Sequence, residues 1–317
     1  MPEYLAPGVY VEETSFRAKS IEGVGTSTTA FVGPTRKGPF RAADDTPETP
    51  ELLTSYGDFE RIYGGFDDLA LGGTAATNYL AHAVLGFFNE GGSRLYVSRV
   101  VGAGAAFAAA AVRAGAADEQ VNFVARFPGV VGNGDVTVRE QLAPASLATM
   151  AAAPAGTLLR SGPPAALTHH VKVGLEWRPA GNLASPPADP ATLAAASAQI
   201  LTLLTVATDE SGEVVSLDNM GFDRTHPRWV GHAMAERPAR RSDHLNNLFA
   251  IRIGANASAI ELRDALFTGG AVNAQGEMER TWELTGGNDG GVPADDNYRL
   301  APSPLSPAMR APVVRAR

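Results

Sequence analysis

The segment FFNEGGSRLYVSRVV, residues 87–101, contains the end of a helix, a glycine pair and a strand in direct succession. Apolar side chains at helical spacing predict a helix over residues 75–89; they are Leu80, Val84, Phe87 and Phe88. Gly91 and Gly92 suit the backbone turn that ends a helix. The run RLYVSRVV, residues 94–101, has the β-branched and aromatic content of a strand. The segment therefore favours a helix packed on a strand.

The preceding residues extend this unit. The run STTAFVG, residues 27–33, predicts a strand that Pro34 ends. Ser55 and Asp58 have the spacing of a capping box with Asp in place of Glu, which predicts a short helix through Ile62. The order strand, helix, helix, strand is typical of an α/β unit.

The composition changes after residue 102. Residues 102–117 are nearly all Ala and Gly and read as a linker. Further strands are predicted beyond it, separated by Ala- and Pro-rich loops at 143–166 and 178–190; the strands are 121–127, 135–140, 172–176, 214–217 and 248–253. The predicted organisation is an arm and linker (1–26), an α/β part (27–103), a β-rich domain (104–285) and a poorly ordered Gly/Pro/Arg-rich tail (286–317).

The chain opens with an isolated strand, YLAPGVYVEE, residues 4–13. Val9 and Val11 point to one face of this extended segment, and Tyr10 and Glu12 to the other. The residues that follow it are polar, with no second strand close by. A lone strand cannot satisfy its own backbone groups, so it must join a sheet of this chain or of a neighbour.

Length, charge and cysteine content limit the classes of protein to which the chain can belong. A chain of 317 residues predicts about two domains. The formal charge of −8 argues against a nucleic-acid partner, which requires a basic surface. The absence of cysteine excludes disulfides, thiolate metal sites and a Cys nucleophile. The sequence contains neither a signal peptide nor a run of ~20 apolar residues, so we expect synthesis in the cytoplasm and no direct membrane insertion.

One segment suggests a nucleotide site. The strand at 94–101 runs into GAGAAF, residues 102–107, which resembles the start of a dinucleotide fingerprint. Phe107 occupies a position that needs a small residue, and Asp118 and Glu119 precede the next strand rather than ending it. An Ala/Gly linker is the favoured interpretation, and a nucleotide-binding enzyme is the alternative.

Other candidate sites are weaker. Asp223, His226 and His232 could surround a metal, but the histidine spacing matches no helical ligand pair, and DRTHP reads better as a turn. The acidic pairs lie in predicted loops or at strand ends, and the sequence contains no G-x-S-x-G elbow or phosphate loop. We therefore predict no catalytic, cofactor-binding or metal-binding residues and a protein that is not an enzyme.

Six segments together resemble one family. They are YLAPGVYVEE, TAFVGPTRKGP, LLTSYGDFERIYGG, FFNEGGSRLYVSRVV, ARFPGVVGN and LTGGNDG, in this order over residues 4–290. In this order they resemble contractile tail sheath proteins, which form the sheath of contractile-tailed phages and of bacterial contractile injection systems.

The resemblance implies a fold and a mode of assembly. The fold would be mixed α/β, with a split α/β inner domain, an inserted β-rich outer domain and an extended N-terminal arm. The arm would add a strand to a neighbour's sheet, with strand 94–101 as the sheet-forming strand. The implied interface residues are Tyr4, Leu5, Val9, Tyr10, Val11, Glu12 and Glu13. Subunits would stack as hexameric rings around an inner tube, and contraction would draw its energy from subunit packing, with no cofactor.

The resemblance also implies partners and a location. The partners are the inner tube protein, the baseplate and the tail terminator, and the chain would be assembled in the bacterial cytoplasm into a phage tail or an injection particle. In the family the chain returns after the Gly-rich stretch to build the second half of the inner domain. Here 27 residues follow Gly290. We therefore expect a second, full-length sheath subunit to cover the open strand edges, and the alternative is a truncated accessory paralogue that does not polymerise alone.

Overall fold

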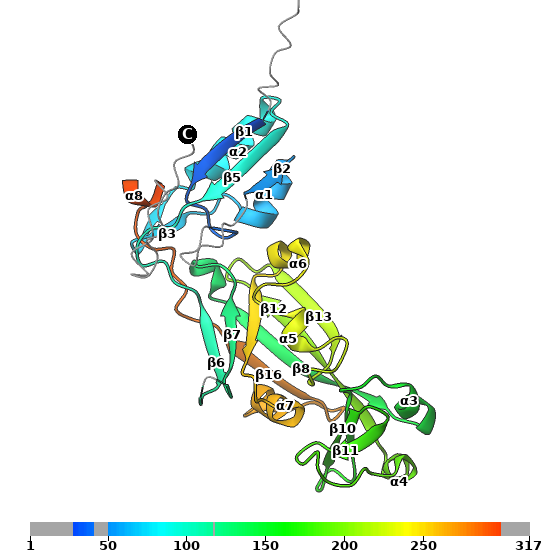
Figure 1. Ribbon diagram of the computed structural model, residues 1–317. Helices are drawn as coiled ribbons and strands as arrows, with labels where there is room; N and C mark the ends of the chain where they lie inside the picture. Colours follow the sequence, from blue (N-terminus) through cyan, green and yellow to red (C-terminus); the bar gives the residue numbers. More distant parts are fainter. Residues whose placement is uncertain (1–27, 41–49, 117, 299–317) are drawn as a thin grey trace, which may run out of the picture.

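The computed structural model describes residues 28–40, 50–116 and 118–298, and the predicted arm strand, residues 4–13, lies outside them. Over these residues the chain is mixed α/β, with several sheets and short helices. Figure 1 shows a smaller α/β part at the top and a larger strand-rich part below it. The fold class predicted from the sequence is therefore correct at the level of a mixed α/β chain.

The α/β part is built around a three-stranded sheet with the order β1-β5-β2, in which β1 is parallel and β2 antiparallel to β5. Its elements are β1 (Thr28–Gly33), β2 (Glu51–Leu53), α1 (Tyr56–Tyr63), β3 (Leu69–Leu71), β4 (Thr74–Ala76), α2 (Tyr79–Asn89) and β5 (Arg94–Arg99). Both helices contribute buried side chains to one apolar cluster with the sheet. The predicted strand, helix, helix and strand are present in that order, but β2, β3 and β4, which lie between them, were not predicted.

The two helix starts show how local polar groups set the boundaries. Ser55 caps α1 as predicted, because its Oγ accepts a hydrogen bond from the Asp58 amide at 3.1 Å. The helix predicted over 75–89 begins only at Tyr79, since Asn78 Oδ1 accepts from the Ala81 amide. The four residues before Asn78 belong to the β3–β4 hairpin and its exit instead.

The strand-rich part is built on one large antiparallel sheet, in the order β11-β10-β9-β12-β8-β16-β15, with β13 also paired to β12. These strands are β8 (Asp135–Pro144), β9 (Leu158–Ser161), β10 (Thr168–Val173), β11 (Glu176–Pro179), β12 (Gln199–Thr208), β13 (Val214–Met220), β15 (Ala271–Val272) and β16 (Met278–Glu283). A second sheet has the order β14-β7-β6, from β6 (Ala109–Arg113), β7 (Val121–Ala125) and β14 (Phe249–Ile253). Short helical segments connect the strands; they are η1 (Val130–Gly132), α3 (Leu147–Ala152), α4 (Pro190–Ala195), α5 (Val230–Ala233), α6 (Arg241–Asn246), α7 (Ala259–Phe267) and α8 (Asp295–Tyr298).

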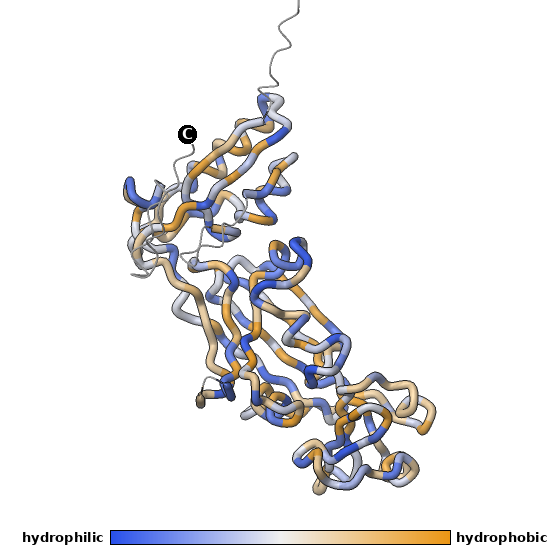
Figure 2. Tube along the Cα trace, in the orientation of Figure 1, coloured by the Kyte–Doolittle hydropathy of each residue, from blue (hydrophilic) through white to orange (hydrophobic). Residues whose placement is uncertain are grey.

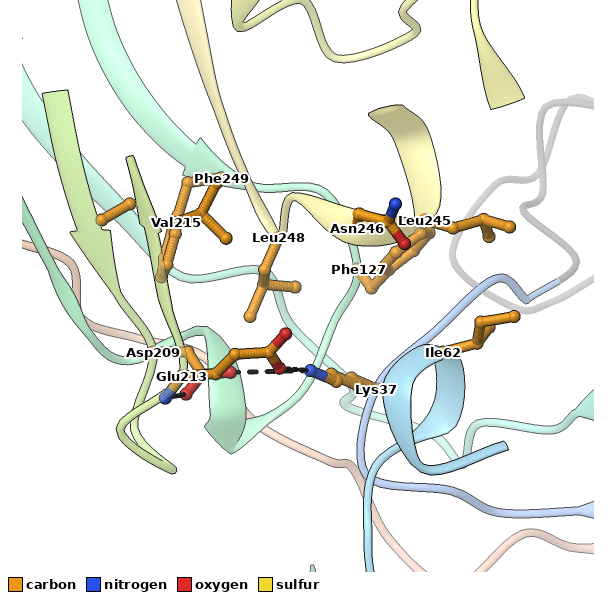
Figure 3. Close-up of a pocket in the computed structure, with 11 residues that line it drawn as sticks. Lys37, Ile62, Phe127, Asp209, Glu213, Val215, Leu245, Asn246, Leu248 and Phe249 are labelled. Carbon is orange, nitrogen blue, oxygen red and sulfur yellow. Dashed lines mark hydrogen bonds and ion pairs between the residues drawn. The ribbon is translucent and has the colours of Figure 1, made fainter. Parts of the chain in front are cut away.

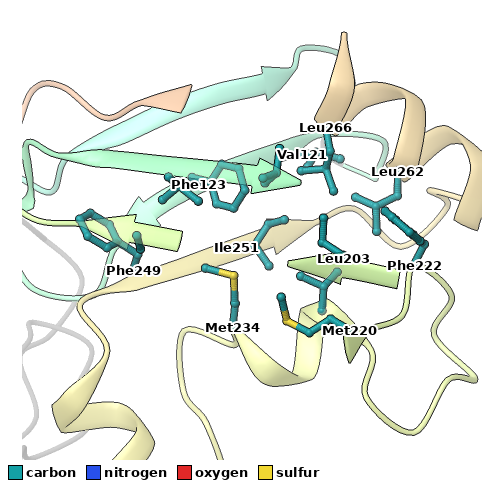
Figure 4. Packing of buried hydrophobic residues seen from close by; sticks show 14 of the residues in the cluster. Val121, Phe123, Leu203, Met220, Phe222, Met234, Phe249, Ile251, Leu262 and Leu266 are labelled. Atoms are coloured by element: carbon teal, nitrogen blue, oxygen red, sulfur yellow. The ribbon is translucent and has the colours of Figure 1, made fainter. Parts of the chain in front are cut away.

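The core of this part lies between the two sheets and α7 (Figure 4). Leu203 of β12, Phe123 of β7 and Phe249 of β14 are almost completely buried in it. From Leu201 to Thr208 the residues of β12 alternate between buried and half-buried, so one face of β12 packs into the core. Figure 2 shows hydrophobic residues along the strands of both parts.

Several predictions for residues 102–213 need correction. The presumed linker 102–117 contains β6, which pairs with β7, and the presumed loop 143–166 contains α3 and β9. The central strand β12 was not predicted at all. Tertiary pairing rather than local preference decides the structure of β6, because its alanines alone favour a helix.

The far end of the molecule has a small core of its own, made by Met150, Leu159, Trp177, Leu193 and Ala198. A buried ion group lies near it and joins two strands of the large sheet to α7: the fully buried Glu140 of β8 accepts from Arg160 Nη1 of β9 at 3.3 Å and from Arg263 Nε of α7 at 3.0 Å. Two arginines offset the cost of burying the Glu140 carboxylate, so removing either one would leave it under-compensated.

Substitution Leu203→Ala tests the central place of β12. Leu203 is 0% exposed and lies between the sheets, so its truncation should lower the free energy of unfolding by about 2–5 kcal/mol. The neighbouring Leu204 lies on the other, half-buried face, and Leu204→Ala is the matched control with less than half that effect. Urea unfolding of both variants gives the comparison; equal losses would contradict the assignment of faces.

The pH dependence of stability should reflect His170, the buried histidine of β10. Burial lowers the pKa of His170 below its usual value of 6.5. The unfolded chain then binds more protons than the folded one just below pH 6.5, so the free energy of unfolding falls as the pH drops from about 7 to 5. His170→Gln should flatten this slope in urea titrations at a series of pH values, and a slope equal to that of the unchanged chain would contradict the prediction.

Candidate assembly surface and domain junction

The sheet of the α/β part offers an edge to a further strand, but not at the strand predicted from the sequence. The strand predicted over 94–101 is confirmed as β5 (Arg94–Arg99), and it lies in the centre of the sheet, with both main-chain edges paired. A strand from outside therefore cannot add to β5. The predicted interface residues Tyr4, Leu5, Val9, Tyr10, Val11, Glu12 and Glu13 lie outside the described residues.

The two edge strands are β1 and β2, and β1 is the longer one. It spans six residues, and within the described ranges its outer edge pairs with no strand, whereas β2 at the other edge spans three. The sheet face away from the helices also carries apolar groups: Val32 is 53% exposed and Leu52 is 40% exposed. Parallel strand pairs such as β1–β5 are usually covered on both faces. The exposed apolar side chains on this uncovered face are typical of a surface that binds another protein.

A groove of about 440 Å³ lies beside β1, along the flank of α2. Its lining is Phe31 of β1, a row on α2 and the turn into β5, namely Ala83, Gly86, Phe87, Glu90, Gly91, Gly92 and Ser93. Phe31 and Phe87 meet edge to face with ring centroids 5.9 Å apart. Three glycines keep the groove wide, and among the described residues that line it Glu90 alone is charged.

Arg99, at the end of β5, joins the α/β part to the strand-rich part. Its side chain is buried, and it donates to the carbonyls of Thr35 (3.2 Å) and Gly38 (3.1 Å) in the loop after β1. Nη2 also donates to the carbonyl of Pro128, at 2.8 Å, in the strand-rich part. Burial lowers the pKa of Arg99 to about 10, and the charge of Asp289 opposes this shift, so the guanidinium stays protonated at neutral pH.

Asp289 ties three segments together at the same junction. Its Oδ2 accepts from the Ala70 amide and its Oδ1 from the Val130 amide, each at 2.9 Å. The residues around it run beside the exit from β5, since Ala106 and Asn288 form a β-bridge. Part of the segment predicted to be a poorly ordered tail, Gly286 to Gly291, is therefore packed between the two parts.

Close backbone contact explains the glycines of this junction. A Cβ on Gly102 would lie 2.0 Å from the carbonyl oxygen of Gly291, and one on Gly287 would lie 2.4 Å from that of Gly129. These separations are far below any van der Waals contact. Gly102 of GAGAAF and Gly287 of LTGGNDG are therefore required where the two crossing segments touch.

A second set of charges lies on the rim of the junction (Figure 3). Arg36 pairs with Asp67 of the α/β part and with Glu210 of the turn between β12 and β13. Lys37 pairs with Glu213 and lies 3.8 Å from Asp209. The cavity that Lys37, Asp209 and Glu213 line with apolar residues holds only about 10 Å³, room for roughly one water molecule and not for a substrate.

The segment 102–107 does not have the context of a dinucleotide site. The residues after it form strand β6, not the helix whose N-terminus binds the pyrophosphate. Ala105 and Ala106 are engaged in backbone contacts with Gly102 and Asn288. The pattern that suggested a nucleotide is explained by the close crossing at the junction.

The histidine-containing segment is a turn, as the sequence indicated. Asp223 Oδ1 accepts from the amide of Thr225 at 2.8 Å, and His226 Nδ1 accepts from the amide of Arg228 at 3.1 Å. Among the described residues no group of three or more His, Asp or Glu side chains is arranged to hold a metal ion. In the same residues no helix is long and apolar enough to cross a membrane.

Comparison with known proteins gave no match: no family model matches the chain, and no curated protein is significantly similar to it. Arg99, Asp289 and the groove are functional candidates that the sequence did not indicate. A sequence pattern could have identified Arg99, because it follows Leu95 and Val97 at alternate positions of one strand and therefore lies on the same buried face. No local sequence pattern predicts the groove, since its shape depends on how α2 packs on β1.

Substitution of Arg99 tests the junction. Arg99→Met should lower the free energy of unfolding by about 3–5 kcal/mol, because it leaves buried carbonyls unsatisfied and Asp289 without a compensating charge. Arg94→Met changes an exposed arginine at the other end of the same strand and should cost less than about 0.5 kcal/mol. Urea unfolding measures both losses, and a small loss for Arg99→Met would show that the junction does not depend on it.

Proposed function

We propose that this chain is a structural subunit of a contractile sheath, which surrounds an inner tube and drives it into a target membrane by contraction. The fold proposed with this function is a split α/β inner domain, an inserted β-rich outer domain and an N-terminal arm. The ordered family segments in the sequence motivate the proposal. The observation that carries it is the three-stranded sheet, whose β1 edge pairs with no other described strand and whose face away from the helices exposes apolar side chains.

An incomplete sheet favours a subunit of an assembly over a monomer. An unpaired edge strand offers its main chain to another strand, and exposed Val32 and Leu52 add apolar area on the same sheet. In the proposal a neighbour's arm and a second sheath subunit supply the cover, and the further partners are the inner tube protein, the baseplate and the tail terminator.

The close approach of two chain segments at the junction supports the proposal that the strand-rich part is an inserted domain. The segments that enter and leave the strand-rich part lie side by side, with β-bridges between Ala106 and Asn288 and between Ala109 and Thr285. A domain that is inserted into a parent domain needs its first and last residues close together, as these two segments are. The outer domain in this proposal runs from residue 104 to 285.

The proposed source of energy is the difference in subunit packing between the extended and the contracted sheath. Such a device needs stiff subunits, because a soft joint would absorb the motion. The buried contacts of Arg99 and Asp289 across the junction provide stiffness of this kind. No cofactor has a role in the proposed mechanism.

Deletion of residues 1–13 should leave a folded chain that no longer assembles, because in the proposal the arm supplies the strand that joins one subunit to the next. Deletion of residues 305–317 removes the same length from the other end and serves as the control. Negative-stain electron microscopy of the chain with its native partners measures assembly, and circular dichroism checks folding.

Striated tubes from the chain lacking residues 1–13 would exclude the arm as the joint. Discrete particles from the full-length chain with every partner present would instead favour the accessory paralogue. Incorporation of the control deletion but not of the arm deletion would support the proposal.

A further inference from the structure

The groove beside β1 lies where an added strand would place its side chains. A strand on the outer edge of β1 would point every second side chain toward the helix side of the sheet. Phe31 of β1 points to that side and lines the groove, and the flank of α2 forms the opposite wall. The free main-chain edge and the groove therefore form one continuous docking surface.

The lining of this surface suits small apolar side chains. Phe31 and Phe87 offer ring surface, and the glycines leave room that side chains would fill. A Cβ at Gly86 or at Gly91 would meet no atom within 4 Å. Valine or another β-branched residue at alternate positions of a strand matches this lining.

We propose that residues 4–13 of the same chain dock on the outer edge of β1, with Val9 and Val11 in the groove, and so cap the free subunit. Val9 and Val11 share one face of the predicted strand. The tether, residues 14–27, has 14 residues and a typical end-to-end distance of about 20 Å, enough to reach back to β1. The proposal uses the same predicted strand as the proposed function but does not depend on a contractile role.

The short length of the tether determines whether the strand on β1 comes from the same chain or from another copy. A short flexible linker gives an effective concentration in the millimolar range, about a thousandfold above a subunit at micromolar concentration. The chain's own arm therefore occupies the edge in the dilute protein. This cap protects an edge that would otherwise pair at random, and assembly then exchanges the same contacts between copies, as in domain swapping.

Crosslinking tests the cap directly, because the chain has no cysteine of its own. Glu13→Cys places a thiol next to the arm's valines, and Ala83→Cys places one at the groove. The double variant, treated with a flexible bis-maleimide at about 1 μM, should give an intramolecular product. A mixture of the two single variants at the same concentration should give no dimer.

A blocking variant identifies the groove as the docking site. Gly86→Leu in the double-cysteine background fills the groove, and leucine favours the helix more than glycine does, so the fold is retained. It should lower the intramolecular product about tenfold or more, as expected when a docking strand is overpacked. Gly181→Leu makes the same change at an open glycine far along the chain and should have no effect.

Hydrogen exchange supplies a second measurement without cysteines. The β1 amides should exchange about tenfold slower in the full-length chain than after deletion of residues 1–13. Equal exchange rates, or an intramolecular product that Gly86→Leu leaves unchanged, would overturn the proposal. A dimer from the mixed single variants without an intramolecular product would also overturn it, while leaving strand exchange between copies in place.

Discussion

The guanidinium of Arg99 satisfies backbone carbonyls on both sides of the domain junction, and the relation between the two parts of the molecule depends on it. The ion pairs of Arg36 and Lys37 cross the same junction, but their acidic partners Glu210 and Glu213 are about half exposed. Exposed pairs of this kind contribute about 0–1 kcal/mol each. A buried charge whose partners are removed costs several times more. The buried arginine therefore fixes the junction, and the pairs on the rim only add to it.

The glycines of the junction and the arginine form a single arrangement. Arg99 can reach the Pro128 carbonyl only because the chain segments around Gly102, Gly129 and Gly287 approach without side chains between them. Asp289 then accepts amide hydrogens from both parts within the same region. A side chain at any of these glycines would push the segments apart and lengthen several hydrogen bonds at once. This close approach explains why two glycine-rich stretches almost two hundred residues apart in the sequence are needed together.

The sequence predicted the α/β part well because its signals are local: Ser55 caps a helix, Gly91 and Gly92 end one, and residues 94–99 carry a strand pattern. The strand-rich part was predicted less completely. Both faces of β12 carry apolar residues, such as Leu203 and Leu204, so hydropathy does not alternate along it although burial does. The alanines of β6 favour a helix, and only pairing with β7 makes them a strand. The junction and the groove arise from contacts between distant segments, which no local pattern encodes.

The free edge of β1 raises the question of what could hold a strand there and still release it. Each added main-chain hydrogen bond contributes about 0.5–1.5 kcal/mol, whereas ordering each residue of an arm costs about 1–2 kcal/mol. Hydrogen bonds alone therefore do not hold an arm on β1. Burial of a valine contributes about 1.5–3 kcal/mol, so the apolar groove lined by Phe31 and Phe87 decides the balance. With so small a margin, the proposed arm would exchange between its own subunit and a neighbour when the neighbour's surface adds further contacts, as the proposed assembly from capped subunits requires.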